Sequence, residues 1–254
     1  MVRRIAAIVL PELACELARR STRSRTTSQG AHDEPQAVIV AEDAFSNDAG
    51  LISAPDRNEL LAAVDERAWR YGARPGQSVA EAAAFVSRLN IVRLEPRSLR
   101  DALGTVADVA LGYGTTAALD LRCDARRLAT SESTYYPLGA GAGPDDTVWL
   151  DVTGMSRLTG GEDLLAAELR EKAQSLGHRA RVAIANGPRI AQAIARWAPP
   201  TREELISRDG RDLQSLPIAA LPLSHDNLCW LAKLGILRID DLAKLDRARL
   251  SHRL

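Results

Sequence analysis

The stretch PDDTVWLDVTGMSRLTGGE, residues 144–162, decides the interpretation of the whole chain. It begins with two adjacent carboxylates, Asp145 and Asp146, which come just before a short apolar run that carries a third carboxylate, Asp151. A short apolar run of this length predicts a strand over 147–152. Carboxylates at the start of a strand supply the hard oxygen ligands that Mg²⁺ prefers. The stretch therefore indicates a metal site, the remnant of one, or an ordinary Asp-containing turn before a strand.

Two features of this stretch have ordinary structural explanations. Asp151 shares the less apolar face of the strand with Trp149, so we expect it to pair with an Arg rather than to bind a metal. The GGE segment that ends the stretch lacks the strand, Gly-rich loop and Lys of a phosphate loop. Glu162 and Asp163 instead suit the first turn of a helix, which we expect over 162–176.

Outside this stretch, short apolar runs alternate with amphipathic segments, and residues 21–35 form a polar loop. Ser78, with Glu81 three residues later, predicts a capping box at the start of a helix. The other predicted helices are 12–20, 57–71, 98–112 and 189–197. The other predicted strands are 5–10, 37–40 (with 51–53 beside it), 91–94, 117–121 and 181–185. This order indicates an α/β (α+β) core of ferredoxin-like size, followed after residue 200 by short helices only.

Composition excludes few classes of function. The chain has 254 residues, and 33 basic residues balance 33 acidic ones, so net charge gives no sign of a nucleic-acid partner. The three cysteines are far apart and include no CxxC pair, which indicates neither a zinc site nor a disulfide framework and suits the cytoplasm. No apolar run approaches the roughly 18 residues of a membrane span, and the one near the N-terminus is too short for a signal peptide.

Four segments, in this order, resemble the Y-family (UmuC-type) DNA polymerases, and most closely their catalytically degenerate ImuB-like members. They are IAAIVLPELA (5–14), RAWRYGARPGQSVAEA (67–82), VWLDVTGMSRLTGGE (148–162) with RVAIANGPRIAQAIAR (181–196), and LAKLGILRIDDLAKL (231–245). The third is the most specific, and the fourth is a general helix-hairpin-helix pattern. Together they span almost the whole chain.

The resemblance implies a split palm of ferredoxin-like type with small fingers and the start of a helical thumb. The palm-like domain would comprise residues 1–12 and 92–203, and the fingers-like domain residues 13–91. The thumb would begin at residue 204 and hold the hairpin motif within 204–254. Y-family proteins continue past this point, so we expect the chain to be a truncated form.

In active Y-family members, the first strand and a central hairpin supply three carboxylates for two metals about 3.5–4 Å apart. The resemblance places the first of these carboxylates on Val9, which cannot bind a metal. It places the central Asp-Glu pair on Asp146 and Thr147, so one carboxylate of three is kept. Asp146 is therefore expected to be a remnant ligand, with no metal bound.

The resemblance also assigns the cations that hold the nucleotide triphosphate. The Tyr and Arg of the fingers fall on Glu66 and Trp69, and the palm Lys falls on Gln192. The nearest cations to Gln192 are Arg189 and Arg196. Because several groups that stabilise charge in the transition state are missing together, we expect a pseudo-polymerase.

The hairpin motif around Gly235 has two interpretations. Lys233, Gly235 and Arg238 could contact a DNA phosphate, with backbone N–H groups helped by nearby cations. Alternatively the motif is a purely structural pair of thumb helices, because Asp240 and Asp241 follow it and repel phosphate.

Three functions follow as hypotheses. The first is a non-catalytic scaffold in damage-induced translesion synthesis, which the resemblance links to DNA, a sliding clamp, an ImuA-type RecA-related protein and an error-prone C-family polymerase. The second is an active, divergent polymerase that rebuilds its Mg²⁺ site from Asp146 with Glu12 or Asp145. The third is an α/β interaction module unrelated to polymerases.

Overall fold

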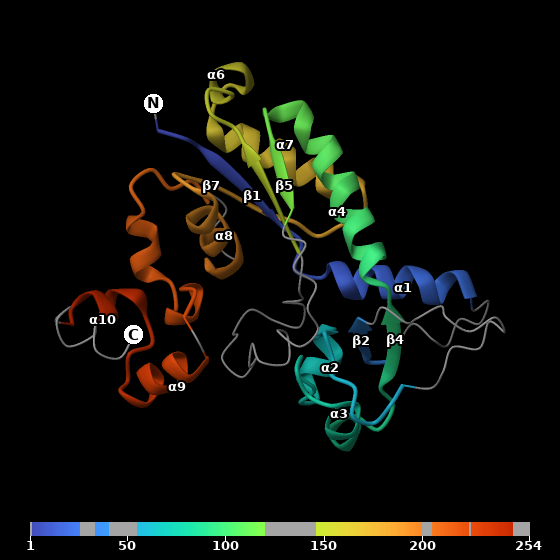
Figure 1. Cartoon of the computed structure of the whole chain (residues 1–254). Coiled ribbons are helices and arrows are strands. Elements are labelled where there is room, and N and C mark those ends of the chain that lie inside the picture. The colour runs from blue at the N-terminus through green and yellow to red at the C-terminus, as the bar shows by residue number, and fades with distance from the viewer. Residues whose placement is uncertain are drawn as a thin grey trace.

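The computed structural model describes residues 2–25, 34–40, 55–119, 146–199, 205–223 and 225–245. These residues form two β-sheets with helices packed on them, followed by a smaller helical part (Figure 1). The mixed α/β class expected from the sequence is thereby confirmed.

The larger sheet has four strands in the order β5–β6–β1–β7, and all neighbouring strands are antiparallel. Alternate residues of each strand face opposite sides. On one side Ile8, Leu150 and Ile184 form a common core with Leu103 and Leu169 from two long helices. The strands are β1 (Ile5–Val9), β5 (Ala117–Leu119), β6 (Thr147–Asp151) and β7 (Arg181–Ala185), and the helices are α4 (Pro96–Ala110) and α7 (Glu162–Ser175).

The opposite face of this sheet is covered by α8 (Pro188–Trp197). Ala7 and Ala183 of the sheet pack with Ala191, Ile194 and Ala195 of the helix, and all five are buried. Small side chains on both surfaces allow the helix to lie close to the strands. The polar residues of α8 that face the sheet therefore lie next to the end of β1 and the start of β6, where the candidate site is found.

The smaller sheet has three strands in the order β3–β2–β4, with β2 parallel to β4 and antiparallel to β3. The capping box predicted at Ser78 is confirmed: Glu81 N–H donates to the Ser78 hydroxyl, and Ser78 N–H donates to the Glu81 carboxylate at 2.8 Å. Helix α1 lies between the two sheets (Figure 1). The elements are α1 (Leu13–Arg25), β2 (Gln36–Val40), β3 (Ala63–Val64), α2 (Glu66–Arg70), α3 (Val79–Phe85) and β4 (Asn90–Leu94).

The C-terminal part consists of short helices, and its described residues include no strand, as the sequence predicted. Gly235, at φ +77°, ends α9 with a left-handed turn: Gly235 N–H donates to the Ala232 carbonyl and Ile236 N–H to the Leu231 carbonyl. None of the helices in the described residues is long and apolar enough to cross a membrane. The remaining helices of the described residues are η2 (Leu111–Tyr113), α6 (Ser156–Thr159), η4 (Arg211–Ser215), η5 (Ile218–Ala220), α9 (His225–Lys233) and α10 (Ile239–Ala243).

The polar loop predicted from residue 21 is wrong over its first five residues, because α1 continues to Arg25. The hydroxyls of Ser21 and Thr22 donate to the Ala18 carbonyl one turn back, at 2.8 and 3.0 Å. Such bonds satisfy the hydroxyls inside a helix, so polarity alone did not end it. Residues 26–33 of the predicted loop lie outside the described residues.

The helix predicted over 57–71 is also wrong for most of its length. Only Glu66–Arg70 are α-helical, and Asp65 starts this helix by accepting a hydrogen bond from Ala68 N–H at 2.8 Å. Just before it, Ala63 and Val64 form β3, and Ala62 N–H is bonded to the Val38 carbonyl. Pairing with β2 therefore overrode a helical spacing of apolar residues. The partner predicted for β2 at 51–53 lies outside the described residues.

The expected domain division stays a prediction. Strand β4 crosses the boundary placed between residues 91 and 92, because all its residues pair with β2 in the smaller sheet.

Candidate functional site

The positions assigned to the first and central polymerase motifs lie together in the structure. Val9, at the end of β1, is paired with Thr147 on one side and with Arg181 on the other. Asp146 immediately precedes β6, and its carbonyl accepts a hydrogen bond from Leu10 N–H at 2.7 Å. Carboxylates at Val9, Asp146 and Thr147 would therefore be neighbours, as a shared metal site requires. Asp145 lies outside the described residues.

Asp146 is sealed in a polar cluster beneath α8. The residue is only 3% exposed, and its Oδ1 accepts hydrogen bonds from the Arg196 guanidinium and from the Thr147 hydroxyl, the latter at 2.8 Å. Gln192, one helical turn before Arg196, donates to the Thr147 hydroxyl oxygen at 3.1 Å. Burial raises the pKa of the Asp146 carboxyl, although Arg196 and Thr147 both act to lower it. The carboxylate is thus committed to an internal ion pair.

These residues do not fit a two-metal centre. Mg²⁺ requires several hard oxygen ligands, and the Val9 side chain offers none. The one carboxylate present, that of Asp146, is already paired with the positively charged guanidinium of Arg196. The second carboxylate oxygen of Asp146, Oδ2, is buried and has no hydrogen-bond partner among the described residues. A cation at Oδ2 would still lie beside the Arg196 guanidinium, which repels it.

The cluster borders a cavity of about 600 Å³ between the sheet, α8 and residues 219–222. Trp149 forms one wall and donates its indole N–H to the Pro188 carbonyl at 3.2 Å. Arg189, Gln192 and Arg196 line the cavity from α8, and none of its described lining residues is acidic. A cavity with arginines and no carboxylate does not suit a divalent cation.

The two positions that the resemblance assigns to the triphosphate in α2, Glu66 and Trp69, do not take part in this cluster. Glu66 forms an exposed ion pair with Arg70 at 2.5 Å, one helical turn away. The Trp69 ring packs against the core of the smaller sheet, and the Arg74 guanidinium lies 4.0 Å from its centroid. Their interpretation as degenerate positions that do not bind the nucleotide stays a prediction, as does that of Gln192.

The other acidic residues near the strand ends are also paired. Asp151 lies 3.2 Å from the Arg3 guanidinium, so its predicted pairing with an Arg is confirmed, and a hydrogen bond from Thr153 lowers its pKa. Glu12, which an active site would have to recruit, binds Arg179 at 2.5 Å and approaches Arg19 at 3.7 Å.

The hairpin residues assigned to DNA are all exposed, but their charge is partly cancelled. The Arg238 guanidinium lies 3.4 Å from the Asp240 carboxylate, and Gly235 is used to end α9. Lys233 is exposed and has no charged partner among the described residues. DNA contact here therefore stays a prediction that rests chiefly on Lys233.

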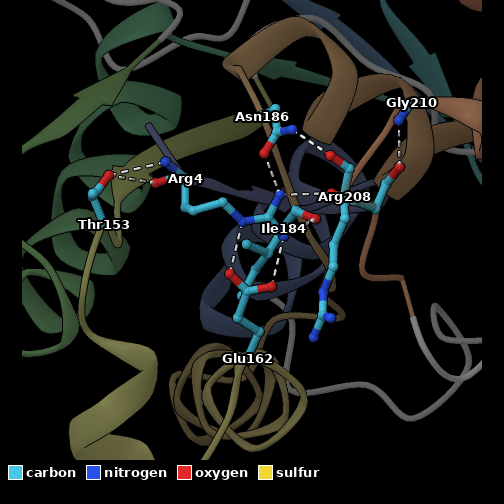
Figure 2. A network of polar contacts seen from close by, with 8 residues as sticks. Arg4, Thr153, Glu162, Ile184, Asn186, Arg208 and Gly210 are labelled. Atoms are coloured by element: carbon cyan, nitrogen blue, oxygen red, sulfur yellow. Dashed lines mark hydrogen bonds and ion pairs between the residues drawn. The ribbon is translucent and has the colours of Figure 1, made fainter. Parts of the chain in front are cut away.

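One polar network was not foreseen from the sequence (Figure 2). Arg4 forms a two-pronged ion pair with Glu162, with Nε–Oε1 and Nη2–Oε2 distances of 2.7 and 2.6 Å. Its Nη1 also donates to the Asn186 side chain at 2.6 Å and to the Ser207 carbonyl at 2.7 Å. Asn186 in turn donates to the Arg208 carbonyl. The network joins the start of β1, the first turn of α7, the end of β7 and the segment that follows α8.

Comparison with known proteins agrees with the resemblance seen in the sequence. No family model matches the chain. Over 182 residues the chain is 29% identical to the protein named ImuB of Caulobacter vibrioides, in strains NA1000 / CB15N and ATCC 19089 / CIP 103742 / CB 15. The match covers 72% of this chain but 35% of the relative, so the chain spans about a third of that protein's length.

The fold is that of solved DNA polymerase structures. DinB from Sulfolobus solfataricus matches 98% of the chain with a TM-score of 0.65 at 13% identity, and the chain covers 62% of it. A ternary insertion complex of Dbh DNA polymerase gives the same TM-score and coverage, and a Y-family Dbh–Dpo4 chimera gives a TM-score of 0.64. At such low identity these structures show the fold alone. The chain therefore has the fold of the Y-family DNA polymerases and is ImuB-like in sequence.

Proposed function

We propose that this chain is the polymerase-like part of a non-catalytic protein that acts as a scaffold or adaptor in damage-induced translesion DNA synthesis and mutagenesis. The observation that supports this most is the state of Asp146. At the place where the motif comparison puts a metal ligand, a buried carboxylate is paired with Arg196 and Thr147, beside Val9. Such an arrangement supplies no metal pair for phosphoryl transfer.

The proposed role requires partners that do the chemistry. We propose DNA, a sliding clamp, an ImuA-type RecA-related protein and an error-prone C-family polymerase as partners of the complete protein, acting in the cytoplasm. The chain spans about a third of the curated relatives that it matches, so most of these contacts would involve the remaining length. We propose that this part contributes weak, salt-sensitive DNA contact through Lys233, and that it uses no metal cofactor.

A genetic test separates the scaffold from a polymerase. In the complete protein, Asp146→Asn keeps an oxygen that can accept from Arg196 but removes the negative charge that a metal would need. We expect damage-induced mutation frequency in the host to stay at the wild-type level, since no chemistry depends on this carboxylate. Loss of mutagenesis in a variant that still folds and still co-purifies with its partners would contradict the proposal.

The alternative, an active divergent polymerase, would need a second carboxylate near Asp146. Glu12 would have to leave its ion pairs with Arg179 and Arg19 to supply it. Primer extension by the complete protein that depends on Mg²⁺ or Mn²⁺ and disappears in Asp146→Asn would establish this alternative.

A further inference from the structure

A second cavity lies at the other end of the sheet from Asp146. It has a volume of about 680 Å³ and is lined by Arg4, the turn between α6 and α7, Asn186 and Arg208. Arg4 precedes β1, whereas Val9 beside Asp146 ends it, so the length of the strand separates the two places. This cavity therefore belongs to a different surface from the candidate site.

The cavity carries an excess of positive charge. Three arginines and one acidic residue line it, and the acidic residue, Glu162, is taken up by its two-pronged pair with Arg4. Arg157 and Arg208 are exposed and have no charged partner among the described residues. The guanidinium of Arg208 points away from the network of Arg4 (Figure 2). Asp163, in the first turn of α7, is exposed nearby but does not line the cavity. Two unpaired guanidinium groups thus face the cavity.

Exposed apolar side chains lie near these arginines. Val2 is 64% exposed and lines the cavity, while Leu158 in α6 and Leu164 in α7 are 80% and 55% exposed. Leu164 packs against Gly160, another lining residue: a Cβ at Gly160 would lie 3.1 Å from Leu164 Cδ1. Large apolar side chains gathered in one place on a surface mark sites of protein contact.

We propose that this surface, formed by Val2, Arg157, Leu158, Leu164 and Arg208 and here called the α6–α7 surface, binds a protein segment in which an apolar side chain is flanked by carboxylates. The two unpaired guanidinium groups complement carboxylates, and Val2 and the two leucines complement an apolar side chain. A nucleic-acid backbone would use the arginines but would leave the leucines in water. The proposal does not depend on the loss of catalysis, because an active polymerase with this surface would bind the same segment.

The test uses the chain as it is and a labelled synthetic peptide in which leucines alternate with pairs of aspartates. We expect a Kd below about 1 mM by fluorescence anisotropy, and backbone NMR shifts confined to 156–164 and Arg208. A peptide with asparagine in place of aspartate should bind at least about tenfold more weakly than the acidic peptide. The acidic peptide should also bind at least about tenfold more weakly to the double variant Arg157→Glu/Arg208→Glu than to the unchanged chain. Leu158→Ser, at a residue exposed enough to leave folding intact, should also weaken binding. Arg97→Glu, at an 80% exposed side chain on α4, is the control and should change nothing.

Several results would overturn the proposal. They are the absence of acidic-peptide binding, equal affinity for the two peptides, and unchanged binding in the charge-reversal variant. If charge reversal weakened peptide binding but Leu158→Ser did not, the surface would be a site that binds anions without recognising an apolar side chain. A single-stranded DNA that binds the same residues more tightly than the acidic peptide would mean a nucleic-acid surface. Concentration-dependent NMR shifts at 156–164 without peptide would mean that the occupant is a second copy of the chain.

Discussion

Replacing Arg196 with methionine should lower the free energy of unfolding by about 3–5 kcal/mol, because it leaves the buried carboxylate of Asp146 without its counter-charge. Asp146 is 3% exposed and its Oδ2 has no hydrogen-bond partner among the described residues, so the variant leaves a buried carboxylate without a charged partner. Urea denaturation at pH 7 measures the change. Arg189→Met on the same helix is the control, since Arg189 is exposed and has no charged partner among the described residues. It should shift stability by less than about 0.5 kcal/mol.

The destabilisation should depend on pH in a direction that follows from the raised pKa of Asp146. The folded chain binds this proton more tightly than the unfolded chain, in which the carboxyl has its ordinary value of 3.8. The contribution of Asp146 to stability is therefore greatest below that value and is lost as the pH rises through the folded-state pKa. Removing Arg196 raises the folded-state pKa further. The difference between Arg196→Met and the wild type should consequently be smaller at pH 5 than at pH 7.

A double variant shows whether the loss of stability in Arg196→Met comes from the broken ion pair between Asp146 and Arg196. Asp146→Asn combined with Arg196→Met removes the buried charge and should recover most of the stability lost in Arg196→Met alone. A loss in Arg196→Met no larger than in Arg189→Met would contradict the buried ion pair, and so would a failure of the double variant to recover.

Replacing Arg4 with methionine should cost a similar amount, about 3–5 kcal/mol, because one guanidinium binds Glu162, Asn186 and the Ser207 carbonyl. Its side chain is 14% exposed and that of Glu162 is 16% exposed, so the variant leaves a largely buried carboxylate unpaired. The bonds to Asn186 and to the Ser207 carbonyl are lost as well. Arg4→Lys should recover only part of the loss, since an ammonium group cannot reproduce the planar two-pronged contact. Thermal or urea unfolding measures both variants.

The neighbouring residue provides the matched control for Arg4. Arg3 is 78% exposed and binds a single carboxylate, that of Asp151, so Arg3→Met should cost less than about 1 kcal/mol. In hydrogen exchange, Arg4→Met should loosen residues 205–210 more than α4, because the network holds the segment after α8 against the sheet (Figure 2). Equal effects of Arg3→Met and Arg4→Met on stability would show that the network does not act in this way.

Most of the fold could be predicted where local pattern and tertiary contacts agree. Strand β7 has the predicted bounds, α7 begins at the predicted Glu162, and the capping box at Ser78 is present. The failures have two physical causes. In α1, hydroxyls bond back to the helix and extend it beyond the point where polarity suggested a loop. Before α2, pairing with β2 imposes extended structure on a helical pattern.

The candidate site was predictable only in part. The resemblance correctly brought Val9, Asp146 and Thr147 to neighbouring positions, and Gln192 contacts Thr147. Spacing showed only that Arg196 shares a helix face with Gln192. No local signal shows that this guanidinium binds a carboxylate that lies 50 residues earlier in the chain. The network of Arg4 was missed for the same reason, since Glu162 lies 158 residues away and the Arg had no visible partner.

The central claim is that Asp146 belongs to an internal ion pair and no longer binds a metal. Calorimetric titration of the chain with a deoxynucleoside triphosphate and primer-template, first with Mg²⁺ and then with Mn²⁺, tests it most directly. Asp146→Asn is titrated in parallel, with an active Y-family polymerase as the positive control. We expect no binding up to about 1 mM nucleotide for either form of the chain. Metal-dependent binding in the micromolar range that disappears in Asp146→Asn would contradict it.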